Sequence, residues 1–313
     1  MTVTGERSLR GMGGILLGLG LSYFCAYNLF KLPVVLPVLL ETYGYDRTLA
    51  GGYMSVYALM GLLLSVWIGR VSQRRDPLFL VPHALCLLGL AAVVTLMYPQ
   101  FGWVVLGARA LEGCAFAVFA ISGPVLANTS ASERQLPLVI GFTAMWIPIG
   151  QLTASLAAPI ALRSVGWPLL WYLGLFITVG FALLLFRLRH YSVGQKFGEA
   201  AGENPPAPMM QAQRSLLVTA SLVFMIWSGQ YFAYMTWLPQ YLVEVHGTGV
   251  GGALAGYALP VIFVIAFNLV TGFALRAKVP AGWLMMGAMA AQAIAWWMIP
   301  FTADPRIGIA ALV

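Results

Sequence analysis

The sequence predicts an all-α protein with many transmembrane helices. Hydrophobic residues make up 60% of the 313 residues and charged residues only 9%, whereas soluble domains carry about 25% charged residues. The mean hydropathy is +0.85. The apolar residues fall in long runs between short charged loops, and a helix needs ~20 such residues to cross a bilayer. A net charge of +7 could indicate nucleic acid, but the basic residues sit in those loops, so no nucleic-acid partner is expected.

The first 187 residues are predicted to form six spans. Charged residues at both ends delimit most of the apolar runs, and a turn at residues 98–102 divides one run that is too long for a single helix. The predicted spans lie between Arg10 and Glu41, at residues 48–69, on either side of the 98–102 turn between Asp76 and about residue 126, between Arg134 and Arg163, and between Arg163 and Arg187.

Residues 188–215 are basic and rich in glycine and proline, which is typical of a flexible linker. Beyond it, helix 7 follows Arg214, helix 8 ends at Arg276, and helix 9 covers about residues 280–300. Residues 306–313 resemble the first turns of a tenth helix. We therefore expect a six-helix bundle at 1–187, a cytoplasmic linker at 188–215 and an incomplete second bundle at 216–313.

The distribution of lysine and arginine predicts the orientation. Twelve of the 17 basic residues fall in segments on the side of the N-terminus, three fall in loops on the other side, and Lys31 and Arg109 lie within spans. Basic residues favour the cytoplasmic side. We expect a multi-pass protein of the cell's inner (plasma) membrane with a cytoplasmic N-terminus.

A repeat relates the two parts of the chain. The segment 36–44 (LPVLLETYG) ends helix 1, and 238–247 (LPQYLVEVHG) ends helix 7. Related helix starts follow at 49–53 (LAGGY) and 254–257 (LAGY). The repeated segments face the same predicted side, so the repeat is parallel, with a period of six helices.

Three motifs resemble those of the major facilitator superfamily of secondary transporters, and the resemblance extends over the whole chain. Segment 69–76 (GRVSQRRD) is similar to the family's gating loop between helices 2 and 3. Segment 109–115 (RALEGCA) is similar to its helix 4 motif, and 237–242 (WLPQYL) to its exit from helix 7. The loop residues implied are Gly69, Arg70, Gln73, Arg74, Arg75 and Asp76. Gln73 stands where an acidic residue is usual, and Asp76 where glycine is usual. Within the family, the chain is most similar to the cyanate-permease-like branch.

The resemblance implies a six-plus-six helix bundle that moves by alternating access around a central cavity. This chain supplies six helices, three more and the start of another, so a complete copy is expected to have about ninety further residues. A small-molecule substrate, protons as an optional second partner, the lipid bilayer and a monomeric state are expected.

Three charged residues lie inside predicted spans: Lys31 on helix 1, and Arg109 and Glu112 on helix 4. Each costs ~2.5–3.5 kcal/mol at the middle of a helix. Arg109 and Glu112 are three residues apart and share a helix face, and the resemblance brings Lys31 towards them. Two cations with one carboxylate suit an anionic substrate, with Glu112 as the proton-coupling group. The competing interpretations are a pair that only locks packing, and a lysine that reaches the membrane surface.

Neutral side chains are the other predicted substrate contacts. Tyr27 and Asn28 share the helix 1 stripe that leads to Lys31, and helix 7 carries a stripe with helical spacing of Trp227, Gln230, Tyr231 and Tyr234. Ordinary helix packing is the competing interpretation of the helix 7 stripe. The second half has no charged residue inside its predicted spans, so recognition of charge falls to the first half.

Other function classes fit less well. The spans contain no clustered nucleophile, acidic pair or metal-ligand set, and Cys25, Cys86 and Cys114 all lie in apolar runs. Neither an enzyme nor a cofactor nor a metal is therefore expected. A ten-helix drug/metabolite-type exporter is an alternative, although its seam would follow helix 5 and not helix 6. A non-transporting membrane sensor and a membrane-embedded enzyme also compete with the transporter interpretation.

Overall fold

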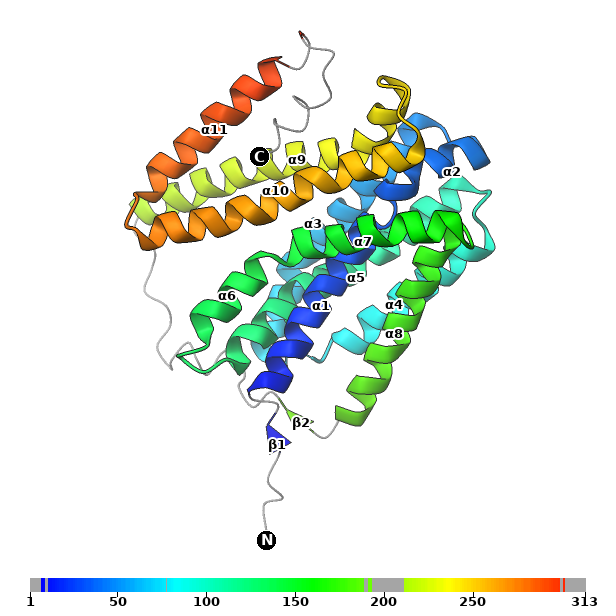
Figure 1. Cartoon of the computed structure of the whole chain (residues 1–313). Helices are drawn as coiled ribbons and strands as arrows, with labels where there is room; N and C mark the ends of the chain where they lie inside the picture. Colours follow the sequence, from blue (N-terminus) through cyan, green and yellow to red (C-terminus); the bar gives the residue numbers. More distant parts are fainter. Residues whose placement is uncertain are drawn as a thin grey trace.

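The structure, a computed structural model, describes residues 7–8, 11–76, 78–188, 191–192, 211–298 and 301, and almost all of them are helical. The first half consists of α1 (Met12–Phe30), η1 (Pro33–Val35), α2 (Leu36–Tyr43), α3 (Arg47–Arg74), α4 (Val81–Met97), α5 (Gly102–Ser130), α6 (Leu136–Ala144), α7 (Trp146–Arg163) and α8 (Pro168–Leu188). The second half consists of α9 (Gln211–Glu244), α10 (Val250–Arg276) and α11 (Ala281–Met298) (Figure 1).

Each of the nine predicted spans corresponds to one helix or to a closely connected group of helices. Helix 1 is α1, η1 and α2 together, and helix 5 is the pair α6 and α7, bent by 49°. Among the described residues, six spans are long and apolar enough to cross a membrane, and the bent pair makes a seventh if it is counted as one span. Helix α9 begins at Gln211, before the predicted boundary at 216. The predicted start of a tenth helix lies outside the described residues.

Prolines account for the two breaks. Pro33 has no N–H to donate to the carbonyl of Leu29, four residues earlier, and α1 stops at Phe30. Pro148 likewise cannot donate to the carbonyl of Ala144, the last residue of α6. The α-helical hydrogen bonding is therefore interrupted within helices 1 and 5, with a bend of 49° in helix 5, while the chain remains helical on both sides of each break.

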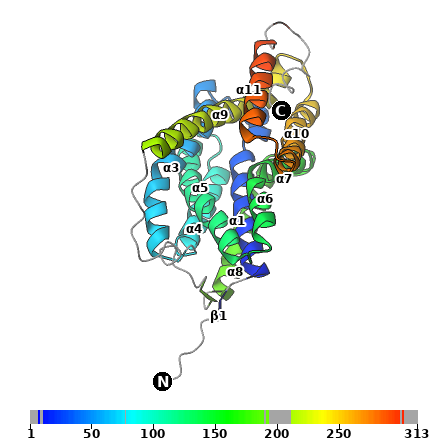
Figure 2. The same ribbon diagram turned by 90° about the vertical axis from the view of Figure 1, so that its left-hand side faces the viewer.

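Helix α5 is the centre of the first half and packs against α1, α3 and α4 (Figure 2). Gly113 makes the contact with α3 possible, because a Cβ atom there would lie only 2.5 Å from the carbonyl oxygen of Tyr57. A short parallel pairing of β1 (Arg7–Ser8) with β2 (Tyr191–Ser192) joins the two ends of the first half. Both ends therefore lie on one side of the bundle, as six crossings require.

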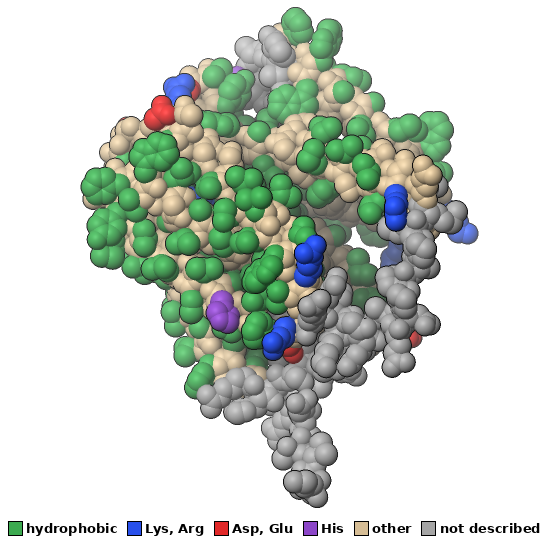
Figure 3. All heavy atoms as spheres, turned by 180° about the vertical axis from the view of Figure 1, so that it is seen from behind, with side chains coloured by type: hydrophobic (Ala, Val, Ile, Leu, Met, Phe, Trp, Pro, Cys, Tyr) green, Lys and Arg blue, Asp and Glu red, His purple; other side chains and the backbone are tan. Residues whose placement is uncertain are grey.

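The second half touches the first half mainly towards one end. Helices α9 and α10 pack on each other, α9 meets η1, α2 and α3, and α10 packs along α7. In the opposite direction α9 diverges from the first half (Figure 1), and the surface shows an opening between the two parts (Figure 3). No described side chain of α9 before Tyr231 is buried. At the contacting end, Arg47 Nη2 lies 2.7 Å from Glu244 Oε1, and the Phe30 ring stacks on Phe232 with centroids 6.0 Å apart.

Candidate functional site

The three charged residues of the predicted site come together inside the first half. Lys31 follows the last turn of α1, and Arg109 and Glu112 lie one turn apart on α5. Lys31 Nζ is 2.8 Å from Glu112 Oε1, and Arg109 Nη1 donates to Glu112 Oε2. The exposed fractions are 0%, 1% and 0% for Lys31, Arg109 and Glu112. One buried carboxylate is therefore shared by two buried cations, and the group carries a formal charge of +1 when all three are ionised.

The guanidinium of Arg109 is saturated by protein acceptors. Besides Glu112, Nη1 donates to the carbonyl of Asn28 (3.1 Å), Nη2 to the carbonyl of Leu29 (3.2 Å) and Nε to the carbonyl of Tyr53 (3.4 Å). Nη2 also points to the sulfur of Met54, at 3.5 Å. The Leu29 carbonyl is the one that Pro33 leaves without a helical partner. All five donors of the guanidinium are thus occupied, and Arg109 caps the break in helix 1.

Lys31, unlike Arg109, is held by side-chain groups and, among the described residues, not by backbone carbonyls. Its Nζ donates to Asn28 Oδ1 at 2.8 Å and lies 5.0 Å from the ring centre of Trp171 on α8. The indole nitrogen of Trp171 is buried and has no hydrogen-bond partner among the described residues. Tyr27 donates from its hydroxyl to the carbonyl of Leu170, also on α8 (2.7 Å). The lysine therefore faces α8 within the first half, and its ammonium does not reach the surface.

The helix 7 stripe forms a second, neutral group between the two halves. The Tyr231 hydroxyl donates to Gln151 Oε1 of α7, and Gln151 Nε2 donates to the hydroxyl of Tyr257 on α10 (2.9 Å). Trp227 stacks on Tyr231 with ring centres 5.5 Å apart and is 42% exposed. Gln230 is only partly buried, but its Nε2 atom is shielded from solvent without a hydrogen-bond partner in the described part of the chain.

Tyr234 instead contacts the second half: its ring meets the ring of Trp296 on α11 edge-on, with ring centres 5.6 Å apart. The structure therefore collects Trp227, Gln230 and Tyr231 near the seam between the halves and places Tyr234 against the second half.

The predicted gating loop lies where α3 ends. Gly69 and Arg70 belong to the last turns of α3, and the side chains of Gln73 and Arg74 lie outside the described residues. Arg75 lies over the ring of Phe79, 5.2 Å from its centre. Asp76 Oδ1 accepts a hydrogen bond from the backbone N–H of Leu78 (2.7 Å) and so shapes the turn into α4.

Sequence reasoning missed Gln151, Tyr257 and Trp171. Gln151 is an uncharged polar residue in the middle of a predicted span, which is a signal by itself. Tyr257 ends one of the repeated segments, 254–257, and its counterpart Tyr53 is also fully buried. Trp171 carried no signal, because its importance comes from the approach of α8 to α1.

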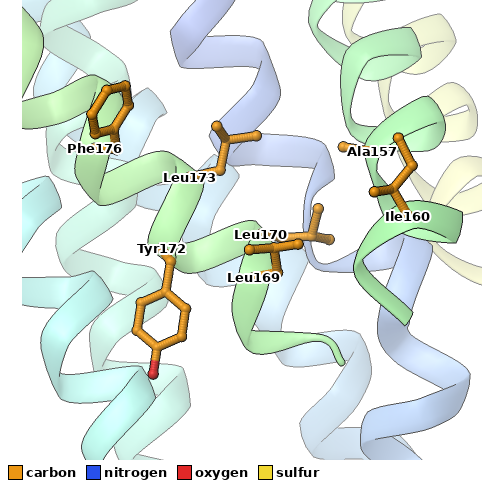
Figure 4. Close-up of a pocket in the computed structure, with 7 residues that line it drawn as sticks. All are labelled: Ala157, Ile160, Leu169, Leu170, Tyr172, Leu173 and Phe176. Atoms are coloured by element: carbon orange, nitrogen blue, oxygen red, sulfur yellow. The ribbon is translucent and has the colours of Figure 1, made fainter. Parts of the chain in front are cut away.

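A pocket of about 380 Å³ lies between α7 and α8 (Figure 4). Its lining consists of Ala157, Ile160, Leu169, Leu170, Tyr172, Leu173 and Phe176. Ile160 and Phe176 are strongly exposed, so the pocket opens on the apolar outside of the bundle, and none of the predicted site residues lines it. Within the described ranges, no three His, Cys, Asp or Glu side chains are grouped in a way that could hold a metal ion.

Comparison with known proteins identifies the family. The family model described as Major Facilitator Superfamily matches residues 15–313. The chain belongs to the major facilitator superfamily. It is 25% identical to an uncharacterized MFS-type transporter, YbcL, of Bacillus subtilis (strain 168), over 74% of this chain and 57% of that protein. The chain thus spans a little more than half the length of that relative.

The fold is similar to that of a transporter of known structure. The crystal structure of a bacterial homolog to the human lysosomal transporter Spinster, in an inward-facing and occupied conformation, matches with a TM-score of 0.64. The match covers 95% of this chain and 70% of that one at 18% identity.

These findings confirm the predicted family, the major-facilitator fold and a multi-pass membrane protein of a transporter family, not an enzyme family. The alternative of a ten-helix drug/metabolite-type exporter is wrong, because the chain belongs to another superfamily.

Proposed function

We propose that the protein moves a small monoanion across the cell's inner (plasma) membrane by alternating access, with Lys31 as the cation that meets the substrate. The observation that carries this proposal is the buried group of Lys31, Arg109 and Glu112, with two cations for one carboxylate. A buried excess charge is costly in an apolar interior. A bound monoanion would bring the sum of charges to zero.

The three charged residues have different parts in this proposal. Arg109 contributes its charge and the shape of helix 1, because all its donors are already engaged. Lys31 can exchange partners, since Glu112 and Asn28 hold its ammonium through side chains alone. A substrate anion that takes the place of Glu112 at Lys31 frees one carboxylate oxygen. Glu112 can then accept a proton, which would couple proton movement to substrate movement.

Neutral groups complete the proposed recognition. Tyr27 and Asn28 would hydrogen-bond the anion beside Lys31. Trp227, Gln230 and Tyr231 would line the path between the halves, and Tyr234 would support it through Trp296. The loop from Gly69 to Asp76 would act as the gate on the cytoplasmic side.

The setting of the site is part of the proposal. The bias of lysine and arginine supports a cytoplasmic N-terminus, and a monomer is the proposed working unit. A place in the cyanate-permease-like branch fits this substrate class, because cyanate is a small monoanion.

The test is uptake of radiolabelled cyanate, formate and acetate into vesicles by a full-length relative that carries these residues, with Lys31→Gln, Arg109→Gln and Glu112→Gln compared at equal amounts of membrane-inserted protein. Lys278→Gln, a change of an exposed lysine after α10, is the matched control. We expect both cation variants to lose uptake and Glu112→Gln to lose only its dependence on pH. Unchanged uptake in Lys31→Gln and Arg109→Gln would leave the group as a packing element and refute the proposal. Absence of uptake by the unmodified full-length relative would favour a sensor.

A further inference from the structure

The hydrogen-bonded chain Tyr231–Gln151–Tyr257, here called the seam triad, links the two halves through buried side chains. Gln151 comes from α7 of the first half, and the two tyrosines come from α9 and α10 of the second half. The Gln151 amide uses its oxygen for Tyr231 and its nitrogen for Tyr257. All three side chains are buried, so the bonds form away from competing water or lipid headgroups.

The seam triad lies where α9 changes from exposed to buried. Before Tyr231, no described side chain of this helix is buried, whereas Met235, Leu238 and Leu242 beyond it all are. Further along, the stack of Phe30 on Phe232 and the ion pair of Arg47 with Glu244 join the halves. The triad is therefore at the level of α9 where its exposed part ends and its contact with the first half begins.

We propose that Gln151 is a positioning residue that holds the Arg47–Glu244 end of the protein closed. This inference rests on the proposed function, because only alternating access requires that end to open. Opening moves α9 away from the first half and separates Tyr231 from Gln151. The amide and the hydroxyl then exchange their mutual hydrogen bond for bonds to water, and the net value of the buried bond favours the closed state. The surface ion pair of Arg47 with Glu244 contributes less, because both of its side chains are well exposed.

The seam triad therefore shifts the equilibrium between the closed and the open state of the Arg47–Glu244 end towards the closed state. A buried amide with two partners is worth more than either bond alone, since losing it leaves two hydroxyl groups without their partner. A substrate that supplies its own hydrogen bonds at this level would lower the cost of opening. The seam triad would thus make opening easier when the site is filled than when it is empty.

The experiment measures opening directly by thiol labelling. In a chain whose three native cysteines, Cys25, Cys86 and Cys114, are replaced by alanine, the substitution Leu238→Cys introduces a thiol. Leu238 is buried and lies two helical turns from Tyr231 on the same face of α9. The protein is placed in membrane vesicles, and a membrane-impermeant maleimide is added on the side of the membrane where Arg47 lies. The reagent reaches this thiol only when the Arg47–Glu244 end opens.

We expect Gln151→Met to raise the labelling rate about tenfold, which corresponds to ~1.4 kcal/mol. Tyr231→Phe, which removes one oxygen, should give a rise of about three- to tenfold, and the double variant should add little to Gln151→Met. The matched control is Ser155→Ala on the same helix, because its buried hydroxyl donates to the carbonyl of Gln151 within α7 and, among the described residues, has no bond to the second half.

A labelling rate in both Gln151→Met and Tyr231→Phe within twofold of the control, or below it, would overturn the proposal. Tyr231→Phe keeps the test decisive if Gln151→Met does not fold. The outcome is independent of the anion hypothesis, which depends on uptake by Lys31→Gln. Failed uptake with increased labelling would remove the proposed substrate class and leave the seam triad in place.

Discussion

Arg109 is predicted to stabilise the protein by capping the helix break that Pro33 creates. Replacing Arg109 with methionine removes three interhelical hydrogen bonds to backbone carbonyls, worth ~0.6 kcal/mol each in membrane proteins, or ~2 kcal/mol together. The change also breaks a buried ion pair with Glu112. Lys31 still pairs with Glu112 in this variant, so the carboxylate does not become an unpaired buried charge, which is the case that costs ~3–5 kcal/mol. We therefore expect Arg109→Met to lower the free energy of unfolding by ~2 kcal/mol, the value of the three hydrogen bonds.

The role of the cap can be isolated with a second change at the break. Pro33→Ala restores an N–H that can bond the carbonyl of Leu29 in the helical manner. In the Arg109→Met background this carbonyl lacks its partner, so Pro33→Ala should recover about 1 kcal/mol. In the unmodified protein Arg109 already satisfies the carbonyl, and Pro33→Ala should not stabilise.

The assay is equilibrium unfolding in mixed micelles by titration with a denaturing detergent, applied to the two single variants and the double variant. The cycle should show a coupling of about 1 kcal/mol between positions 33 and 109. Independent sites add within ~0.5 kcal/mol. If Pro33→Ala has the same effect in both backgrounds within that margin, Arg109 does not act as the cap.

Three further predictions concern the helix 4 motif, the charge group and the topology. Gly113→Val should abolish insertion of folded protein, because a Cβ atom there meets the Tyr57 carbonyl at 2.5 Å, whereas Gly107→Ala, with nothing within 4 Å, should be neutral; equal yields by size-exclusion chromatography would contradict this. Glu112→Gln should destabilise by ~3–5 kcal/mol by leaving two buried cations without a carboxylate, and Lys31→Met should cost less because it leaves the pair of Arg109 and Glu112 intact; thermal unfolding in micelles decides the order. Cysteines at Gln195 and Gln100 should react with an impermeant reagent from the cytoplasm only and from outside only, respectively, and labelling of both from one side would disprove the helix count.

Much of the fold could be predicted from the sequence because lipid restricts the alternatives. A chain in a bilayer must satisfy its backbone internally, so long apolar runs indicate helices, and charged residues mark most of their ends. The break in helix 1 was harder to locate. Pro33 and Pro37 signal it, but the only charge between Arg10 and Glu41 is Lys31, so charged residues do not show where one helix ends and the next begins.

One part of the candidate site could likewise be predicted from the sequence, and another part could not. Lys31, Arg109 and Glu112 stand out because charge is rare in spans, and the spacing of Arg109 and Glu112 predicts their pairing. The sequence could not show that Arg109 has no donor left for a substrate, since its acceptors are backbone carbonyls of Asn28, Leu29 and Tyr53. Every residue has a carbonyl, so no side-chain pattern reveals which ones a cation will meet.

The saturation of Arg109 also has a mechanical consequence. The Arg109 side chain of α5 is hydrogen-bonded to backbone carbonyls of α1 and of α3. These backbone atoms cannot change position by a rotamer change, as side chains can. Sliding any of these three helices past another would break several of these bonds at once. The first half is therefore expected to rotate as a rigid body, with most of the movement where α7 meets α10.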